Sequence, residues 1–432
     1  MKGHYCTVQR ITEKVVQRNG TIEKRRLVTY GCNTHDLLAS NEVDGMIEST
    51  RNVPAYANAL AHFGEANSRT FIATPALLCD VALLVSNIEG MADEARASDV
   101  SLRPHLKSHK SAFILELQLK AGACGVACAK LGEAEAIIEA RGKGAAVLSV
   151  LLTSPLVGHH AALRAVTLAA RCDLIAVVDH VDGVDELAHA LVDTNATIAV
   201  LCDVDVGLGR TGVTTPTDAL LVAERVGQFP QLVFSGVQGY GGHLQHIAGR
   251  EHRRTQTTAA MKRLQSVIDA LESNGHDVSV RTGGGTGTSS IDIELGVLNE
   301  LQPGSYVFMD REYRDALGDD REGRFQQSLT ILTSVISANH EGFVTVDAGL
   351  KSMATDAGPA AVVGNEEATF AFFGDEQGMV TNGAGPAFRR GERLELVPPH
   401  CDPTIDKYDV IWLVHDDVVV DVIDVTARGR SQ

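Results

Sequence analysis

Short runs rich in apolar residues alternate with helical patterns through the middle of this sequence, and this alternation limits the folds open to the chain. Five such runs, at residues 145–152, 174–178, 197–202, 232–240 and 277–280, end in glycine or polar clusters. A strand that is apolar on both faces belongs in a parallel sheet that helices cover. The runs therefore predict a series of β-then-α units.

The segments between the runs carry the marks of helix ends. Thr215-Pro216 offers a capping hydroxyl followed by proline at the first helical position. Apolar residues later recur at spacings of three and four and form one stripe: Met261, Leu264, Ile268 and Leu271. Repeated βα units over roughly 240 residues indicate an α/β protein with a (β/α)8 barrel or a doubly wound sheet. The barrel is favoured because no phosphate-binding fingerprint opens the domain.

The pattern changes after residue 310. Residues that favour strands cluster or alternate without helical segments between them, at 327–338, 342–346, 368–373, 393–397 and 410–425. These clusters predict a mostly antiparallel β domain. We therefore expect an N-terminal extension of unknown role at residues 1–70, the barrel at 71–310 and a C-terminal β domain at 311–432.

Composition excludes several classes of function. The 432 residues are 44% hydrophobic and 22% charged, as in ordinary globular proteins and unlike disordered ones. The net charge of −17 opposes binding to a phosphate backbone, so we expect no nucleic-acid partner. No apolar run approaches the ~18 residues of a membrane span, and no secretory signal is evident. Eight dispersed cysteines indicate reduced thiols and a cytoplasmic protein.

Basic residues gather in the run 103–110, which reads RPHLKSHK and follows a short strand signal. Active sites of barrel enzymes lie at the carboxyl ends of the strands. In extended geometry, alternate residues of the run share one face: Arg103, His105, Lys107 and His109. A lysine among cations in an apolar environment has a lowered pKa, which suits an amine that forms a Schiff base. Lys107 is thus a candidate covalent residue, and a solvated basic loop is the alternative.

Two glycine-rich turns, at residues 283–288 and 303–306, lie late in the expected barrel. Such turns let backbone N–H groups approach an anion, and hydroxyl side chains add further donors. Barrel enzymes commonly bind phosphate at this late position, although either turn could be an ordinary turn. A phosphate site together with a reactive lysine suggests pyridoxal phosphate as the cofactor.

A third candidate element lies in the β domain, in the segment 398–403 with the sequence PPHCDP. If this segment is extended, His400 and Asp402 project the same way. One imidazole and one carboxylate then suit a divalent cation with several positions left open. The alternative is a proline-rich turn in which Asp402 caps its own backbone. Arg210, in the segment 203–213, offers a guanidinium fork for a carboxylate unless that segment is a plain surface loop.

Taken in order, seven segments resemble the metal-activated, pyridoxal-phosphate D-threonine aldolase and 3-hydroxy-D-aspartate aldolase family. They are RPHLKSHK, DVGLGRTGV, GYGGH, GGGTGT, ELQPGSYVFMD, VDAGLK and PHCDPT. That family has the alanine-racemase-like fold and is related to D-serine dehydratase. The similarity covers about residues 72–430 and leaves out the first seventy.

The resemblance implies a role for particular residues. It makes Lys107 the Schiff-base lysine, His243 the catalytic histidine, and His400 and Asp402 the ligands of a divalent cation, Mn²⁺ or Mg²⁺ in preference to Co²⁺ or Zn²⁺. The implied contacts to pyridoxal 5′-phosphate are Lys107, Arg210, Tyr240, Gly284, Gly285, Thr286, Gly287, Gln302, Gly304, Ser305 and Tyr306. Gln302 stands where alanine racemases carry an arginine, so we expect a neutral contact there. His246 lies three residues after His243, and either could be a plain loop histidine.

The implied activity is cleavage of D-configured β-hydroxy-α-amino acids to glycine and an aldehyde, in a homodimer. Dehydratase relatives usually read His-x-Cys where this chain has His400-Cys401-Asp402, which favours the aldolase. The turn 375–378 carries Gln377 where many relatives have histidine, so its role is open. The alternatives are a dehydratase that releases a 2-oxo acid and ammonia, and a pyridoxal-phosphate carrier, which would have no use for His400 and Asp402.

Overall fold

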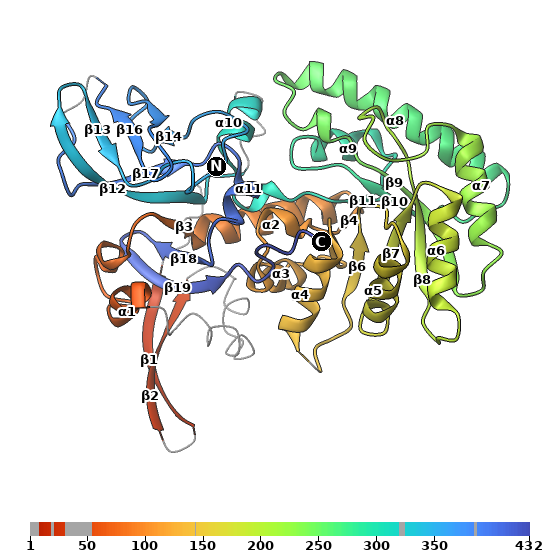
Figure 1. Ribbon diagram of the computed structural model, residues 1–432, viewed down its shortest axis with the longest axis horizontal. Coiled ribbons are helices and arrows are strands. Elements are labelled where there is room, and N and C mark those ends of the chain that lie inside the picture. Colours follow the sequence, from red (N-terminus) through yellow and green to blue (C-terminus); the bar gives the residue numbers. More distant parts are fainter. Residues whose placement is uncertain (1–7, 19–20, 31–53, 143, 319–324, 384–386) are drawn as a thin grey trace.

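The structure is a computed structural model that describes residues 8–18, 21–30, 54–142, 144–318, 325–383 and 387–432. It has two parts, a parallel barrel and a second, mostly antiparallel sheet (Figure 1). Near the N-terminus, β1 (Val8–Arg18) and β2 (Thr21–Tyr30) form an antiparallel hairpin. The rest of the expected 1–70 extension up to residue 53 lies outside the described residues.

The barrel consists of eight parallel strands in chain order. They are β4 (Ser101–Leu102), β5 (Val126–Cys128), β6 (Ser149–Leu152), β7 (Asp173–Val178), β8 (Ile198–Asp203), β9 (Leu232–Gly239), β10 (Val280–Gly283) and β11 (Glu300–Leu301). The last strand, β11, pairs with β4, and an isolated parallel bridge between His105 and Ala127 joins the chain after β4 to β5. The ring is closed in this way, and the predicted barrel is confirmed.

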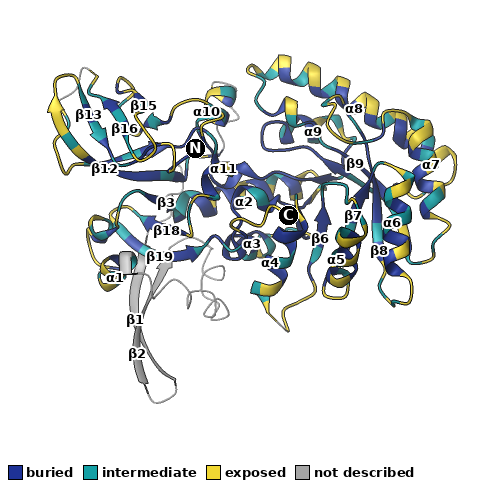
Figure 2. Cartoon of the chain, viewed as in Figure 1, coloured by how far each residue is buried: buried dark blue, intermediate teal, exposed yellow. Residues whose placement is uncertain are grey.

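A helix follows each barrel strand, and all of them except the last cover the sheet from outside. These helices are α3 (Ala112–Lys120), α4 (Leu131–Arg141), α5 (His159–Ala169), α6 (Val181–Leu191), α7 (Pro216–Val226), α8 (Arg250–Ser273), α9 (Ser289–Leu295) and α10 (Arg311–Leu317). Figure 2 shows buried strands and exposed outer faces on α7 and α8. As predicted, the Thr215 side chain caps α7, accepting from Asp218 N, and the stripe on α8 is buried. Within the described part of the chain, no helix has the length and apolar content needed to cross a membrane.

Two of the five predicted strands differ from the structure in extent. The run 145–152 is a strand only from Ser149, and Val147 is 68% exposed. The strand expected at 277–280 begins at Val280 and continues to Gly283. Apolar content marks the right neighbourhood, but it does not separate a strand from the loop residues that lead into it.

The second sheet has nine strands. They are β3 (Ala76–Asp80), β12 (Leu329–His340), β13 (Phe343–Val346), β14 (Ala361–Val362), β15 (Phe370–Phe372), β16 (Gly378–Thr381), β17 (Arg393–Val397), β18 (Val410–His415) and β19 (Val418–Asp424). All of the pairings are antiparallel except that between β3 and β18. The strand β3 precedes the barrel in sequence and pairs with both β12 and β18. The stretch 71–310, expected to be the barrel, therefore gives its first strand to the other sheet.

The residues just before β3 also pack on this second sheet. The helix α1 (Pro54–Ala61) places the Tyr56 ring edge-on to Trp412, with 5.5 Å between ring centroids. Ala59 and Ile72 are fully buried in the same apolar cluster as Trp412. Part of the expected extension is thus built into the core of the β domain. A second helix, α2 (Val81–Ala97), links this sheet to the barrel.

We predict that Gly236→Ala lowers the free energy of unfolding by about 3 kcal/mol. Gly236 in β9 has a φ of 141°, and an added Cβ would overlap the backbone oxygen of Val280 in β10. Gly90→Ala on the exposed side of α2 is the matched control, because nothing lies within 4 Å of its added Cβ, and it should stabilise by up to about 1 kcal/mol. Urea unfolding followed by circular dichroism measures both, and equal stabilities would contradict the prediction.

Candidate active site

The candidate site lies where the β domain reaches the carboxyl ends of the barrel strands. Lys107 is in the 3-10 turn η4 (Leu106–Ser108) that follows β4, and Asp402 is in the short helix α11 (Cys401–Ile405). The Lys107 Nζ is 3.3 Å from Asp402 Oδ2. The two segments that the sequence predicts to meet are therefore adjacent. The Lys107 side chain is 38% exposed, so a small molecule can reach its amine.

The electrostatics of Lys107 differ from the expectation. The carboxylate of Asp402 raises the pKa of Lys107 above its ordinary value, whereas neighbouring cations were expected to lower it. Burial lowers the pKa of His105 to about 3 and that of His109 to about 4, so neither imidazole is charged at neutral pH. Lys107 and His400 in turn hold the pKa of Asp402 below its ordinary value, although burial opposes this.

The outer members of the basic run are bound to carboxylates of their own. Arg103 Nε is 2.9 Å from Glu300 Oε1, and both side chains are buried. Lys110 Nζ is 2.9 Å from Asp406 and 3.5 Å from Glu133. These pairs remove the positive charge expected around Lys107. They also exclude the solvated-loop alternative, because the run 103–110 is almost wholly buried. The 3-10 turn further breaks the alternation that an extended run would have.

The glycine-rich turn after β10 is held in place by Gln245. The Gln245 Oε1 accepts from Gly287 N at 3.0 Å, and its Nε2 donates to Thr288 Oγ1 at 3.1 Å. An added Cβ on Gly285 would lie 2.5 Å from Gln245 Oε1, so the close approach requires glycine. Thr286 Oγ1 accepts from Tyr306 N at 3.0 Å, which joins this turn to the second one.

The second turn lies against the lysine segment. An added Cβ on Gly304 would overlap the Ser108 hydroxyl, next to Lys107. The Ser305 hydroxyl is 3.5 Å from Asp402 Oδ1. Both turns, Lys107 and Asp402 thus form one site. Compact glycine turns with hydroxyl side chains suit a phosphate group.

Two of the predicted cofactor contacts are engaged within the protein. Tyr306 is fully buried, and its hydroxyl accepts from Gln118 Nε2 at 3.0 Å, so its side chain anchors the turn. Gln302 Nε2 donates to Thr282 Oγ1 at 2.9 Å and lies in the barrel interior. These two buried side chains therefore hold the residues of the site in place from the protein interior.

Arg210 and Lys107 both lie near the ring of Tyr240, which follows β9. The Arg210 Cζ is 5.7 Å and the Lys107 Nζ 6.0 Å from the ring centroid. The loop that carries Arg210 is fixed by two carboxylates. Asp203 accepts from Thr211 Oγ1 at 2.7 Å, and Asp205 accepts from two glycine N–H groups of the loop. The arginine is thereby held at the mouth of the barrel.

The two candidate histidines lie in different environments. His243, in the 3-10 turn η5 (Gly242–Leu244), is exposed, and an added Cβ on Gly207 would lie 3.8 Å from its Nε2. His246 Nδ1 is 3.5 Å from Glu312 Oε1, and its ring centroid is 4.2 Å from that of Tyr313. Burial, reinforced by the charge of His400, lowers the pKa of His246 to about 4. The sequence predicts no role for His246.

The predicted metal segment is not extended throughout. His400 has extended backbone angles, but Asp402 lies in the first turn of α11, because Asp310 accepts from Cys401 N at 2.9 Å and starts that helix. His400 Nδ1 is 2.7 Å from Asp356 Oδ2, an arrangement that leaves its Nε2 for a metal ion. No group of three or more His, Cys, Asp and Glu side chains placed to share a metal ion occurs among the residues described. The donor set fits an open site with one imidazole and one carboxylate.

Several residues that shape the site have no role predicted from the sequence. They are Gln245, Glu312 and Asp356, each far from the motif residue that it contacts, and Asp310. Only Asp310 has a readable local signal, since it precedes α10 and accepts from Tyr313 N three residues later, as a helix cap does. Nothing near Gln245 or Asp356 in sequence points to their partners.

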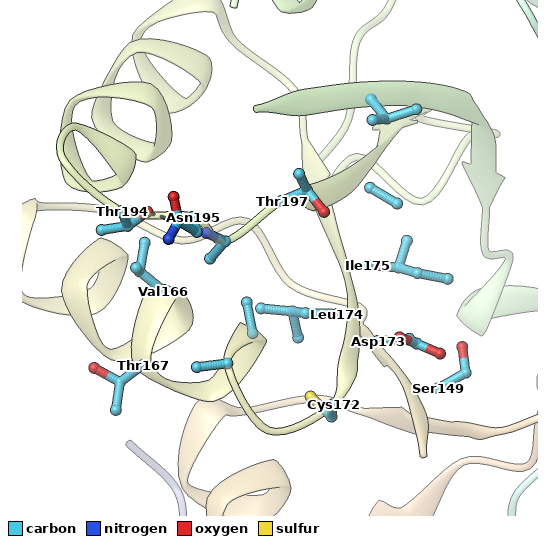
Figure 3. Close-up of a pocket in the computed structure, with 15 residues that line it drawn as sticks. Ser149, Val166, Thr167, Cys172, Asp173, Leu174, Ile175, Thr194, Asn195 and Thr197 are labelled. Atoms are coloured by element: carbon cyan, nitrogen blue, oxygen red, sulfur yellow. Dashed lines mark hydrogen bonds between the residues drawn. The ribbon is translucent and has the colours of Figure 1, made fainter. Parts of the chain in front are cut away.

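A separate cavity of about 890 Å³ lies at the amino ends of β6, β7 and β8, away from Lys107. Ser149, Asp173 and Thr197 line it, together with apolar residues such as Leu174 (Figure 3). The opposite end of these strands faces the site. Active sites of this fold lie at the carboxyl ends, so this cavity is not the candidate active site.

Two family models match the chain. Residues 79–312 match the alanine racemase N-terminal domain, and residues 328–414 match the putative serine dehydratase domain. The first match covers the barrel, and the second covers most of the β domain.

Similar proteins match most of the chain. The D-threonine aldolase of an Arthrobacter species is 37% identical over 361 residues, and the 3-hydroxy-D-aspartate aldolase of Paracoccus denitrificans is 36% identical over 366; both matches cover 83% of this chain and 93% of the relative. The D-threo-3-hydroxyaspartate dehydratase of a Delftia species is 28% identical over 360 residues, 77% of this chain and 91% of that one. The crystal structure of D-threonine aldolase from Filomicrobium marinum superposes with a TM-score of 0.80 at 32% identity, covering 84% of this chain and 98% of that one.

We predict that Asp292, which lies below the first glycine turn, makes stability depend on pH. Burial raises the pKa of Asp292 to about 7, although Thr288 Oγ1 donates to it at 2.6 Å. The protonated carboxyl is favoured in the folded state, so its contribution is full below pH 4 and is lost as the pH rises to about 7. Asp292→Asn should therefore gain stability relative to the wild type between pH 5 and pH 8, on the order of 2 kcal/mol. Asp269→Asn on the exposed face of α8 is the control, and a parallel pH dependence in all three proteins would contradict the prediction.

Proposed function

Because the chain belongs to the D-threonine aldolase and 3-hydroxy-D-aspartate aldolase family of alanine-racemase-like proteins, we propose that it is a lyase that cleaves D-configured β-hydroxy-α-amino acids. Its products are glycine and an aldehyde, and its cofactors are pyridoxal 5′-phosphate and a divalent cation. The observation that carries the proposal is the 3.3 Å separation between Lys107 Nζ and Asp402 Oδ2. An accessible amine and a metal-binding carboxylate within one site are what this chemistry needs.

The residues present fit pyridoxal phosphate. Lys107 supplies the amine that binds it, and the turns at 284–287 and 304–305 supply small residues and hydroxyls for its phosphate. Arg210 and Tyr240 border the same space, and Gln302 offers an uncharged side chain to the cofactor from the protein interior. When bound, the cofactor supplies a sink for the electron pair left on the α-carbon.

His400 and Asp402 would hold the divalent cation, Mn²⁺ or Mg²⁺ in preference to Co²⁺ or Zn²⁺. Asp356 supports this role, because it holds His400 Nδ1 at 2.7 Å and so orients the ring. When bound, the cation supplies a positive charge that makes the β-hydroxyl of the substrate more acidic. The open coordination positions leave room for that hydroxyl.

Other side chains at the mouth would bind the substrate and move a proton. Arg210 is suited to orient the α-carboxylate, since a guanidinium pairs with a carboxylate through two parallel hydrogen bonds. His243 is exposed near the loop that carries Arg210, and an imidazole at this place can take the proton of the β-hydroxyl. Loss of that proton lets the Cα–Cβ bond break and releases the aldehyde.

The dehydratase alternative rests on the second family match, to residues 328–414. In a dehydratase, Lys107 would remove the α-proton, and the β-hydroxyl would leave as water. Asp402 stands where dehydratase relatives usually carry cysteine, and the dehydratase relative is the more distant one at 28% identity. These two observations favour the aldolase.

We also propose that the protein is a cytoplasmic homodimer without nucleic-acid or membrane partners. The net charge of −17 supports the exclusion of nucleic acid. Sites of this fold commonly lie near a dimer interface, which is the reason to expect two copies.

The central test is a product assay. Purified protein with pyridoxal phosphate and Mn²⁺ is incubated with D-threonine or D-3-hydroxyaspartate, and glycine, aldehyde and ammonia are measured together. We expect glycine and aldehyde in equal amounts and no reaction of the L-isomers. Ammonia and a 2-oxo acid without glycine would show that the protein is a dehydratase.

A second test separates an enzyme from a cofactor carrier. We predict that EDTA, or the substitution His400→Ala, lowers the turnover by about 100-fold or more, because the charge on the cation contributes several kcal/mol to the transition state. The absorbance of bound pyridoxal phosphate should persist in the variant. His160→Ala on the exposed surface of α5 is the matched control. Turnover that survives both treatments would rule out metal-dependent catalysis.

A further inference from the structure

His246 is held in a fixed orientation that the proposed mechanism does not use. Its Nδ1 is 3.5 Å from Glu312 Oε1, and its ring packs against Tyr313 at 4.2 Å between centroids. Both partners lie in the first turn of α10. The imidazole therefore has a carboxylate at one nitrogen and an aromatic ring against its face.

The start of α10 and the predicted metal segment form one hydrogen-bonded unit. Glu312 N donates to Pro399 O at 3.2 Å, directly before His400. The buried carboxylate of Asp310 accepts from Tyr313 N and from Cys401 N, both at 2.9 Å. A side chain that Glu312 and Tyr313 hold in place therefore has a fixed position relative to His400 and Asp402.

The other ring nitrogen of His246 has no protein partner. Its Nε2 is a buried atom without a hydrogen bond to any described residue. A carboxylate at Nδ1 favours the tautomer with the proton on Nδ1, which leaves a lone pair on Nε2. Buried polar atoms are normally satisfied, so this acceptor calls for a donor that is not part of the protein.

The charges that surround His246 belong to the site. They are Lys107, His400 and Asp402, besides its own partner Glu312. His400 also has a carboxylate at its Nδ1, since this atom is 2.7 Å from Asp356. Each of these two histidines therefore has a carboxylate at Nδ1 and lies within electrostatic range of Asp402.

We propose that His246 is a third protein group of the metal site, whose Nε2 accepts a hydrogen bond from a water molecule in the coordination shell of the cation. The inference rests on the proposed function, in that a divalent cation binds at His400 and Asp402. We assign it a role through water because, among the residues described, no three His, Cys, Asp or Glu side chains are placed to share a cation. His246 is a positioning residue that strengthens metal binding without being a ligand.

The test compares His246 with a histidine outside the site in the cofactor-loaded protein. The Kd for Mn²⁺, measured from the electron paramagnetic resonance of the free ion, should rise about 10- to 100-fold in His246→Ala. It should change less than about twofold in His252→Ala, an exposed histidine of α8 that serves as the matched control. Glu312→Gln should give an intermediate rise, because it removes the carboxylate that orients the ring.

Further measurements keep the outcomes distinct. Thermal unfolding without metal reports whether His246→Ala folds. If this variant does not fold, the Kd of Glu312→Gln for Mn²⁺ tests the proposal. Spin-echo modulation of bound Mn²⁺ should detect one directly coordinated imidazole nitrogen in both the wild type and His246→Ala. An unchanged Kd in His246→Ala and Glu312→Gln, or two coordinated imidazoles in the wild type, overturns the inference alone. A wild-type protein that binds no Mn²⁺ overturns the proposed metal dependence of the function instead.

Discussion

The carboxylate of Asp310 is the contact on which the geometry of the site depends. It is fully buried at the end of the barrel, and its two oxygens accept from the backbone of α10 and from the backbone of α11. A single side chain thereby starts two helices, α10 directly after the barrel and α11 in the β domain. Together with the ion pair between Lys110 and Asp406, this contact fixes the separation between the lysine at the barrel mouth and the histidine and aspartate of the β domain.

Charge at the site is arranged through pairing. Arg103 and Lys110 are paired with the buried carboxylates of Glu300 and Glu133, and His105 and His109 are neutral because they are buried. Lys107 is left facing Asp402. Buried ion pairs cost desolvation free energy and are retained where they fix geometry. Here they hold the residues on either side of the reactive amine.

The sequence predicts the barrel, the β domain and the meeting of residues near 107 and 400. Apolar periodicity suffices for the two domains, because it is a local signal, whereas the meeting of the two segments is implied by the resemblance of the ordered motifs to a known family. The sequence does not predict that β3 lies in the second sheet, since its five residues read like any buried strand. It also does not predict the roles of Gln245, Asp356 and Glu312, whose partners lie 42, 44 and 66 residues away in the sequence. Such contacts are set by packing, which periodicity does not encode.

The position of β3 determines the order in which the chain can be completed. This strand pairs with Leu329–Leu332 of β12 and with Trp412–Val414 of β18, so the centre of the second sheet is made of residues about 250 to 330 positions apart. Closing such long loops is slow and costs entropy. During synthesis, the whole barrel can emerge and close while β3 has no partner. A truncated chain that ends before β12 would expose the unpaired, apolar strand β3, which is a site for aggregation.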